Sequence, residues 1–422
     1  MMRLFFVFCF LFFASYFCSA QGIPPIGQWR EHLPYNNAIN IIPVEEKIYC
    51  ATPYALFSYD TGEKSFERLS KVNGLSEVGV SRMKYDASAQ KFIIAYQNSN
   101  VDVLYRNDVI NVPDIKLSNV SGDKSIYNIY CFNNRAYLST GLGIIVINQD
   151  KYEVAETYLI GNGGGRIRVN DFTQAAGFFY AATVEGLKRA AVNSPNLSDF
   201  NEWQTISGST GLSAGEYHKV LNVQDKIMVQ KNDSLFIQNG SNWIFFYHDT
   251  WPIGNIDFSE NKILLSETKG IQTRIVVLNT SGATEKVLQN PLLSLPRQAT
   301  IYQSEYWIAD QNNGLFKTDG NSTERVFPNS PINIATGDLV FSGNDLWAAA
   351  GSVSESWTYL FNPNGIYRFS GDFWTGVNQY IYPQLDTLLD FITIAIDKQN
   401  EKVYAGSYGG GLLEINKDNS FK

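Results

Sequence analysis

Short apolar segments separated by small or polar turns recur along most of the chain. In each case a strand-like apolar run is followed by a turn, often with glycine, and then by a second apolar run. Two such runs joined by a short turn predict a β-hairpin. The pattern occurs nine times, at residues 47–60, 91–107, 135–148, 178–191, 226–239, 262–279, 305–319, 345–370 and 402–416.

Each hairpin belongs to a larger unit, because further apolar runs flank it. One run precedes the hairpin, as in AINIIPV (38–44), and another follows it, as in NWIFFYH (242–248). Four short strands that return about every 40 to 48 residues are typical of a β-propeller blade. One blade cannot bury both faces of its sheet, whereas blades stacked around a ring cover one another. An array of β-sandwiches is the competing all-β prediction, but it gives no reason for the near-constant period.

The number of units exceeds the blades of one usual closed propeller, which has four to eight. We therefore predict a seven-bladed β-propeller over residues 21–331, after a signal peptide at residues 1–20. Residues 332–422 are predicted to form two blades of a second, truncated propeller. The boundary is placed at the short polar segment Asn329-Ser330-Pro331. The last blade, which ends in residues 402–422, is expected to lack part of its fourth strand and to keep a free edge, as in a fragment of a longer protein.

The segment GQWREHLPY (27–35) precedes the first unit and looks like the fourth strand of a blade. We predict that it pairs with a blade from the other end of the chain and closes a ring. The seventh unit already has its own candidate fourth strand, TERVFPN (323–329). The sequence therefore does not decide which blade residues 27–35 close.

The composition agrees with a strand-rich protein and excludes one class of partner. Hydrophobic residues make up 44% of the chain and aromatic residues 14%, and aromatic side chains fit the pleated surface of a sheet. The formal net charge is -8, and no run of Lys and Arg is present. A nucleic-acid-binding protein needs a basic face, so nucleic acid is excluded as a partner.

The N-terminus has the three parts of a secretory signal peptide. Arg3 supplies the positive charge, residues 4–13 form an apolar run, and Cys18-Ser19-Ala20 supplies the small residues of a cleavage site before Gln21. A membrane anchor is the alternative, but the apolar run is short for a bilayer span. We expect an exported protein of the periplasm or outer cell surface, with no transmembrane span in the mature chain.

The two cysteines of the mature chain are expected to be free. Cys50 and Cys131 lie in the first and third units, which are not neighbours in a propeller, and a disulfide needs its two Cα atoms within about 7 Å. A bridge between them is therefore the less favoured alternative.

Glycine clusters and histidines do not indicate a cofactor or metal site. The clusters at 161–165 and 409–411 lack the lysine and hydroxyl residue of a phosphate-binding loop and precede strand-like residues, so we interpret them as turns. His32, His218 and His248 fall in different units, whereas a zinc site needs three or four converging ligands. We predict no metal and no cofactor.

No catalytic motif is present, and we predict that the protein is not an enzyme. Asp60, Asp86, Asp397 and Glu414 are candidates for carboxylates around a channel, but roles in turns and at strand ends are favoured for all of them. No ligand-binding residue is assigned. The tryptophans could stack on sugars, although packing between blades is favoured for each; they are Trp29, Trp203, Trp243, Trp251, Trp307, Trp347, Trp357 and Trp374.

Several strands resemble those of known propeller repeats. Residues 49–52 (YCAT), 347–350 (WAAA) and 404–407 (YAGS) stand where the propeller repeats of two-component-regulator sensor domains carry a W-I-G-T-like strand. The whole arrangement is more similar to PorZ-like proteins, the two-propeller cell-surface components of the type IX (Por) secretion system. A signal peptide, the opening GQWREHLPYNNAINI (27–41), seven degenerate blades and the start of a second propeller carry this resemblance.

The resemblance implies a non-enzymatic role in an attachment complex with a sortase, where anionic lipopolysaccharide is delivered for the anchoring of cargo. This chain departs from that pattern because it has only two blades of a second propeller and no C-terminal sorting domain. No binding residue of the family can be matched to it. Two other functions stay open: the extracellular glycan-sensing domain of a hybrid two-component regulator, and an enzyme acting on polysaccharide.

Overall fold

The computed structural model describes residues 29–209, 211–351, 353–416 and 420–422. Its described residues form nine antiparallel sheets, each built from consecutive strands, and the prediction of an all-β fold is confirmed. The first four sheets are sheet one, with β1 (Asn40–Val44), β2 (Lys47–Ala51), β3 (Leu56–Asp60) and β4 (Phe66–Leu69); sheet two, with β5 (Val80–Asp86), β6 (Lys91–Tyr96), β7 (Val101–Tyr105) and β8 (Asp108–Val112); sheet three, with β9 (Ile126–Phe132), β10 (Arg135–Thr140), β11 (Gly143–Asn148) and β12 (Glu153–Tyr158); and sheet four, with β13 (Val169–Ala175), β14 (Phe178–Thr183), β15 (Gly186–Ala191) and β16 (Gln204–Thr205).

The remaining sheets follow the same order of strands. They are sheet five, with β17 (Lys219–Val223), β18 (Lys226–Lys231), β19 (Ser234–Asn239) and β20 (Asn242–His248); sheet six, with β21 (Ile253–Ser259), β22 (Lys262–Lys269), β23 (Gln272–Asn279) and β24 (Thr284–Leu288); sheet seven, with β25 (Pro296–Tyr302), β26 (Glu305–Asp310), β27 (Gly314–Thr318) and β28 (Thr323–Arg325); sheet eight, with β29 (Leu339–Ser342), β30 (Asp345–Ala349), β31 (Ile366–Ser370) and β32 (Phe373–Val377); and sheet nine, with β33 (Phe391–Asp397), β34 (Lys402–Ser407) and β35 (Gly411–Ile415). Short helical turns are α2 (Asp114–Leu117), η2 (Asn162–Gly164), η3 (Phe200–Glu202) and η4 (Pro383–Leu385).

Tight turns fix the hairpin between the first and second strands of several sheets. Both turn residues have positive φ in these hairpins, which is the signature of a type I′ turn, whose twist matches that of the flanking strands. Asparagine and aspartate tolerate this conformation better than most residues. The turns are Asn133-Asn134, Gln224-Asp225, Glu260-Asn261 and Gln303-Ser304.

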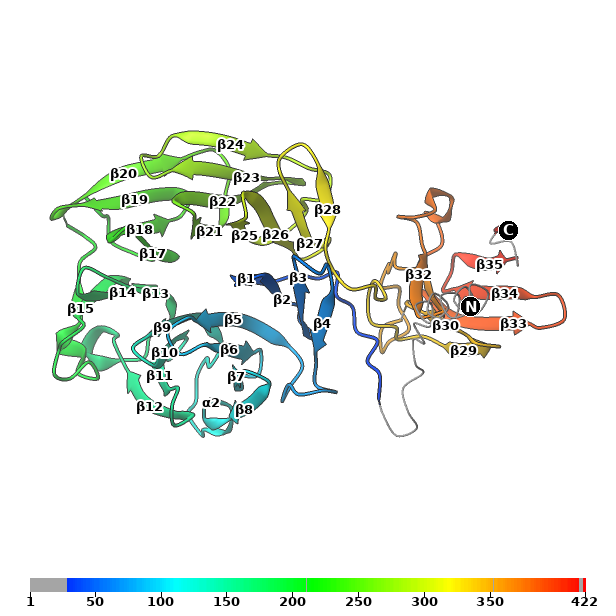
Figure 1. Ribbon diagram of the computed structural model, residues 1–422, viewed down its shortest axis with the longest axis horizontal. Coiled ribbons are helices and arrows are strands. Elements are labelled where there is room, and N and C mark those ends of the chain that lie inside the picture. Colours follow the sequence, from blue (N-terminus) through cyan, green and yellow to red (C-terminus); the bar gives the residue numbers. More distant parts are fainter. Residues whose placement is uncertain (1–28, 210, 352, 417–419) are drawn as a thin grey trace, which may run out of the picture. The chain divides into compact units, whose positions relative to one another are not determined.

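Sheets one to seven form a closed series of contacts, which we call the ring. Each first strand contacts the first strand of the next sheet, in the order β1, β5, β9, β13, β17, β21 and β25, and β25 contacts β1 in turn. Figure 1 shows these first strands on the inside of the ring and later strands, such as β12, β20 and β24, at its outside. The first strands therefore determine which side chains can face the centre.

A buried apolar cluster lies between each pair of adjacent sheets in the ring. Between sheets one and seven, Phe57 and Trp307 are both fully buried. Tyr35 packs edge-on against Phe57, with the ring centroids 5.7 Å apart. Burial of three large aromatic side chains here stabilises the closed ring by several kcal/mol, at roughly 1.5–3 kcal/mol for each.

The prediction of a closing strand at residues 27–35 is wrong for the residues that the structure describes. Residues 29–35 form no strand, and sheet one takes its fourth strand from the adjacent β4. The apolar end of the segment, Leu33 and Tyr35, instead joins the cluster between sheets one and seven. Residues 27 and 28, like the predicted signal peptide at 1–20, lie outside the described residues.

Sheets eight and nine pack on one another through a cluster that includes Trp347, Ile366 and Phe391. Sheet nine has three strands, and the glycines at 409–411 lie at the turn between its second and third strands, as predicted. Lys422 pairs with Glu414 through two backbone hydrogen bonds of 2.9 Å, and Ile415 forms an isolated antiparallel bridge with Phe421, so residues 420–422 lie beside β35. Residues 417–419 lie outside the described residues.

Candidate functional site

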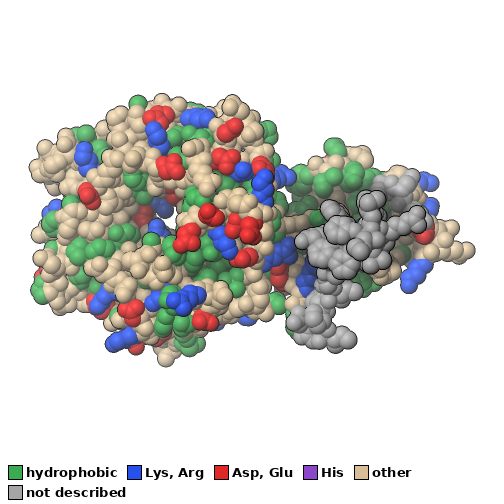
Figure 2. Space-filling model, in the orientation of Figure 1, with side chains coloured by type: hydrophobic (Ala, Val, Ile, Leu, Met, Phe, Trp, Pro, Cys, Tyr) green, Lys and Arg blue, Asp and Glu red, His purple; other side chains and the backbone are tan. Residues whose placement is uncertain are grey.

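The first strands of the ring enclose a central channel with a volume of about 990 Å³, and the space-filling view shows the ring hollowed at its centre (Figure 2). Neighbouring side chains of a strand point to opposite sides, so a channel-lining residue is followed by one buried between sheets. In β25, for example, Gln298 lines the channel and Ala299 is fully buried. The equivalent channel-lining residues of the seven sheets are all polar: Asn40, Arg82, Asn128, Asp171, Lys219, Asn255 and Gln298.

Some of these polar side chains link one sheet to the next. The Asn40 Oδ1 atom accepts a 2.7 Å hydrogen bond from the Met83 backbone N–H, and Asp171 Oδ2 accepts one of 3.2 Å from Val220. At the closure of the ring, Gln298 Oε1 accepts a 2.8 Å hydrogen bond from the Ile41 N–H. First strands are edge strands whose free N–H groups need partners. The channel position therefore has a structural role in these sheets.

Asp257, two residues after Asn255 in β21, makes the same kind of link to the next sheet. Its Oδ2 atom accepts hydrogen bonds from the Ala299 N–H, at 3.2 Å, and from Asn255 Nδ2, at 2.6 Å. Asp338 repeats the arrangement between sheets eight and nine, where its Oδ2 atom accepts from the Ile394 N–H at 3.1 Å. This link is thus a recurrent way of joining adjacent sheets.

The charged residues that line the channel are mostly cationic. Four cations, Arg82, Lys84, Lys219 and Arg297, line it together with two carboxylates, Asp171 and Asp257. The lining therefore carries an excess of two positive charges, although the whole chain has a net charge of -8.

The channel cations are only partly matched by carboxylates. Lys219 Nζ lies 3.9 Å from Asp171 Oδ2. Arg82 Nε donates to the Tyr127 carbonyl at 2.7 Å, and Arg297 Nε donates to Gln311 Oε1 at 2.5 Å. These neutral partners satisfy hydrogen bonds but leave the positive charge in place.

Burial shifts the pKa values of Asp171, Asp257 and Arg82 so that the charged form of each is disfavoured. It raises the pKa of Asp257 to about 6, against the opposing hydrogen bond from Ala299. Burial also raises the pKa of Asp171, and the nearby Lys219 opposes that effect. Desolvation lowers the pKa of Arg82, and repulsion from Arg297 adds to it. Protonation of the two carboxylates would leave the channel more positive.

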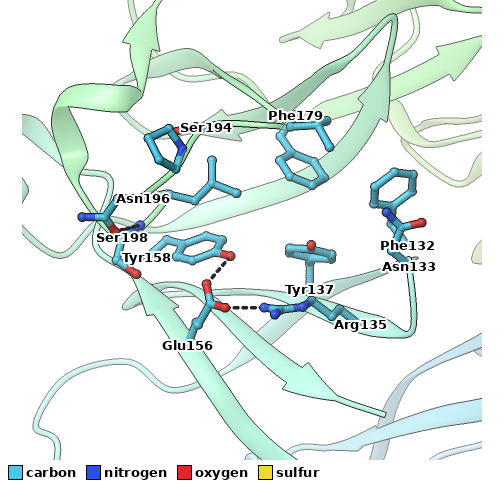
Figure 3. A pocket seen from close by; sticks show the side chains of 13 residues that line it. Phe132, Asn133, Arg135, Tyr137, Glu156, Tyr158, Phe179, Ser194, Asn196 and Ser198 are labelled. Atoms are coloured by element: carbon cyan, nitrogen blue, oxygen red, sulfur yellow. Dashed lines mark hydrogen bonds and ion pairs between the residues drawn. The ribbon is translucent and has the colours of Figure 1, made fainter. Parts of the chain in front are cut away.

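A second, smaller pocket of about 420 Å³ lies between sheets three and four. Figure 3 shows Arg135 of β10 and Glu156 of β12 side by side at one wall, with the rings of Tyr137 and Phe179 nearby. Arg135 and Glu156 form an ion pair, and the Tyr158 hydroxyl donates to Glu156 Oε2 at 2.7 Å.

The charges of this pocket are neutralised within it. Burial alone would raise the pKa of Glu156, but the hydrogen bonds from Arg135 and Tyr158 outweigh it and lower the pKa. Burial raises the pKa of Tyr137 to about 12. The pocket therefore has an apolar wall and one ion pair, and the charges of Arg135 and Glu156 neutralise one another.

The carboxylates considered from the sequence serve in turns and strand pairs, as was favoured. Asp60 and Asp397 accept backbone N–H bonds from the turns that follow them, and Asp86 does so while also accepting from Gln149. Glu414 pairs with Lys402 at 2.7 Å. None of these four side chains lines the channel.

The other residues considered from the sequence do not come together. His218 lies 3.7 Å from Glu216, and His248 Nδ1 lies 3.1 Å from the Asp233 carbonyl. Within the described part of the chain, no group of three or more His, Cys, Asp or Glu side chains could hold a metal ion. Cys50 and Cys131 lie in β2 and β9 and are free.

The expectation that the tryptophans pack between blades holds for part of the set. Trp203, Trp243, Trp307 and Trp347 are buried. Trp29 and Trp357, however, are 87% and 67% exposed, so the prediction is wrong for these two. Trp357 lies in the long connection between β30 and β31, and its ring contacts that of Tyr408, with the ring centroids 6.5 Å apart.

The channel residues were not predicted from the sequence, although the sequence contains a signal for them. In each of the first seven units a polar residue directly precedes a buried apolar residue of the first strand, as in Asn40-Ile41 and Lys219-Val220. Alignment of the units on that buried residue would have indicated the channel position.

Residues 48–204 match the sequence model of the PorZ N-terminal β-propeller domain of the type IX secretion system. The resemblance predicted from the sequence is therefore confirmed over this range. No curated protein sequence matches the chain significantly. No helix among the described residues is long and apolar enough to cross a membrane.

Among solved structures, PorZ of Porphyromonas gingivalis, an essential bacterial surface component of the type IX secretion system, has a TM-score of 0.78 and 20% identity, covering 94% of this chain and 52% of PorZ. This chain thus spans about half the length of PorZ. The β-propeller domain of Cps50 (Swd1) from Myceliophteria thermophila has a TM-score of 0.53 and 8% identity, covering 71% of this chain and 100% of that domain. The extracellular domain of a putative one-component system of B. thetaiotaomicron has a TM-score of 0.37 and 10% identity, covering 92% of this chain and 60% of that domain. The likenesses to PorZ and to the Cps50 domain, at 20% and 8% identity, show a β-propeller fold.

Proposed function

We propose that this chain is the propeller region of a non-enzymatic binding and scaffold protein in the attachment complex of a type IX secretion system. The observation that carries the proposal is the family match over residues 48–204, supported by the likeness to PorZ across nearly the whole chain. The protein would act at the cell envelope, with a sortase and anionic lipopolysaccharide as partners in the anchoring of cargo.

The proposed architecture is a seven-bladed propeller over residues 21–331 and two blades of a second propeller over residues 332–422. The contact of β25 with β1 supports the first part, because it returns the series of sheets to its start. The pairing of sheets eight and nine through Asp338 and a shared apolar cluster supports the second. A scaffold of this kind would present the ring and the two following sheets as separate binding surfaces.

Deletion of the gene in its own organism tests the proposed function. We expect cargo proteins of the type IX pathway to lose surface anchoring and to keep their sorting domains, and we expect the wild-type gene to restore both. Cargo processing can be measured by immunoblot of cell-surface and medium fractions. Normal anchoring and processing in the deletion strain would contradict the proposal. Normal cargo together with altered transcription of glycan-utilisation genes would instead support a sensor domain.

A further inference from the structure

We propose that the central channel of the ring is a binding site for an oxyanion carried by a saccharide, such as a phosphorylated or carboxylated sugar. As the site of the anionic glycan in the proposed function, it rests on that function for its biological ligand. The binding itself follows from the channel lining and can be tested separately.

Like charges from different sheets converge in the channel. Arg82 and Lys84 extend from β5, Lys219 from β17 and Arg297 from β25, so three different sheets supply the cations of one cavity. Like charges repel one another more strongly where protein replaces water. A ligand with two or more negative charges would relieve this repulsion.

Lys84 supplies a cation that is available to a ligand. Its side chain is exposed and lines the channel, and its ammonium group makes no hydrogen bond or ion pair with the residues that the structure describes. An ammonium group has three N–H donors, so Lys84 can bind a phosphate or carboxylate without breaking an existing contact. Lys219, whose nearest carboxylate oxygen is 3.9 Å away, can turn toward the same ligand.

Polar amide side chains line the channel together with the cations. Amides at the equivalent positions of four sheets line the same cavity: Asn40, Asn128, Asn255 and Gln298. Hydrogen bonds hold three of them in place: Asn40 donates to Gln298, Gln298 also accepts from the Ile41 N–H, and Asn255 donates to Asp257. Saccharide hydroxyls suit such a wall, because amide groups both donate and accept hydrogen bonds. The volume of about 990 Å³ is large enough for a sugar with its charged group.

The competing pocket lacks these properties. Arg135 is paired with Glu156, which also accepts from Tyr158. An anion that entered this pocket would have to displace Glu156 from Arg135. The pocket therefore provides a natural internal comparison for the channel.

Isothermal titration calorimetry of the purified whole protein tests the proposal, with mannose 6-phosphate, glucuronate and neutral mannose as probes. We expect binding of at least one charged sugar, weaker binding as sodium chloride is raised, and no binding of mannose. Phosphate and carboxylate sources are distinguished by which charged sugar binds more tightly. Absence of binding by both charged sugars, or equal binding of mannose, would overturn the proposal.

The variants assign the binding to the channel. The double substitution Lys84→Gln with Lys219→Gln should weaken binding by at least about tenfold, because it removes two charge-assisted hydrogen bonds. The control pair Lys64→Gln with Lys226→Gln makes the same change in net charge at exposed positions outside the channel and should leave affinity within about twofold, because distant exposed charges are screened. Lys84→Arg with Lys219→Arg should retain binding, which guards against loss through misfolding. Equal affinity of the Gln pair and the wild type would overturn the assignment.

The outcomes separate this inference from the proposed function. Channel binding together with normal cargo anchoring in the deletion strain would leave the site in place and remove the secretion role. Defective anchoring without sugar binding would support the secretion role and overturn the channel site.

Discussion

The central channel and the pocket between sheets three and four use charge in opposite ways. In the pocket, Arg135 and Glu156 form an ion pair that Tyr158 completes. In the channel, four cations face two carboxylates whose pKa values burial raises. A charge paired at short range is satisfied by the protein itself, whereas an excess of like charge in a cavity needs a counter-ion. The contrast indicates that the pocket is a structural feature and the channel a place for a ligand.

The difference between the two regions follows from how each is built. The pocket lies between two adjacent sheets, and within sheet three β10 and β12, on either side of β11, place Arg135 and Glu156 within ion-pair distance. The channel brings together one strand from each of seven sheets, so its charges are far apart in sequence. Lys84 and Arg297, for example, meet in one cavity only because β25 packs beside β1 and closes the ring.

Ring closure is the condition on which the channel depends, and its disruption should have the largest effect. Phe57→Ala removes a fully buried ring between sheets one and seven and should lower the free energy of unfolding by about 3–5 kcal/mol. Phe373→Ala is the matched control, since Phe373 is 59% exposed on β32, and should change it by less than about 0.5 kcal/mol. Urea unfolding at fixed pH measures both. Equal losses for the two variants would contradict the ring interface.

Removal of a channel carboxylate should sharpen the contrast in ligand binding. Asp257→Asn keeps an oxygen that can accept the Ala299 N–H but removes one negative charge from the lining. We expect affinity for the better charged sugar to rise by about three- to tenfold at pH 7, since one unfavourable charge interaction of about a kcal/mol is lost. Glu156→Gln in the pocket is the control and should leave affinity unchanged. Calorimetry at pH 5 should show a smaller ratio of the variant's affinity to the wild-type affinity. At that pH Asp257, with a pKa of about 6, is mostly protonated in the wild type. A ratio that is the same at both pH values would argue against this carboxylate.

The two regions should also differ in the pH dependence of stability. Burial raises the folded-state pKa of Asp257 to about 6, above its unfolded value, so its stabilising contribution is present below about pH 4 and lost as pH rises through 6. Hydrogen bonds from Arg135 and Tyr158 lower the pKa of Glu156, so its contribution is present above about pH 4.5 and lost as pH falls.

Unfolding free energies of the wild type, Asp257→Asn and Glu156→Gln from pH 4 to 7.5 test these signs. Relative to Asp257→Asn, the wild type should become less stable as pH rises. Relative to Glu156→Gln, it should become more stable. Differences that run in the same direction for both variants would show that one of the two environments is misassigned.

The smallest expected effect concerns the ion pair of the pocket. Arg135→Gln should lower the free energy of unfolding by less than about 1 kcal/mol, because both partners are more than a third exposed and exposed ion pairs contribute little. Its affinity for charged sugars should equal that of the wild type. A loss of affinity as large as that of the Lys84 and Lys219 variants would move the binding site from the channel to the pocket.

The repeated hairpins made the sheets predictable from the sequence, because their alternation and turn chemistry are local. Cys50 and Cys131 fell in the predicted strands for the same reason, and the glycines at 409–411 in the predicted turn. The prediction of a strand at residues 27–35 failed because an apolar and aromatic segment can either pair as a strand or insert its side chains between two sheets. Tyr35 packs between two sheets, and only the tertiary structure decides between those outcomes.

The channel could not be read from any single unit. Lys84 in one strand looks like an ordinary exposed lysine of an amphipathic strand, and Lys219 does as well. Whether these two lysines face a shared channel depends on the number of sheets in the ring and on the register of each first strand. The exposed Trp357 was missed for a related reason, since its burial depends on whether a neighbouring sheet covers the connection between β30 and β31.

A crystal structure of the protein with mannose 6-phosphate or glucuronate bound, chosen by the calorimetric result, tests the central claim most directly. We expect the phosphate or carboxylate within hydrogen-bond distance of Lys84 Nζ and Lys219 Nζ inside the ring. Ligand density beside Arg135 and Tyr137 in the pocket, with an empty channel, would contradict the account.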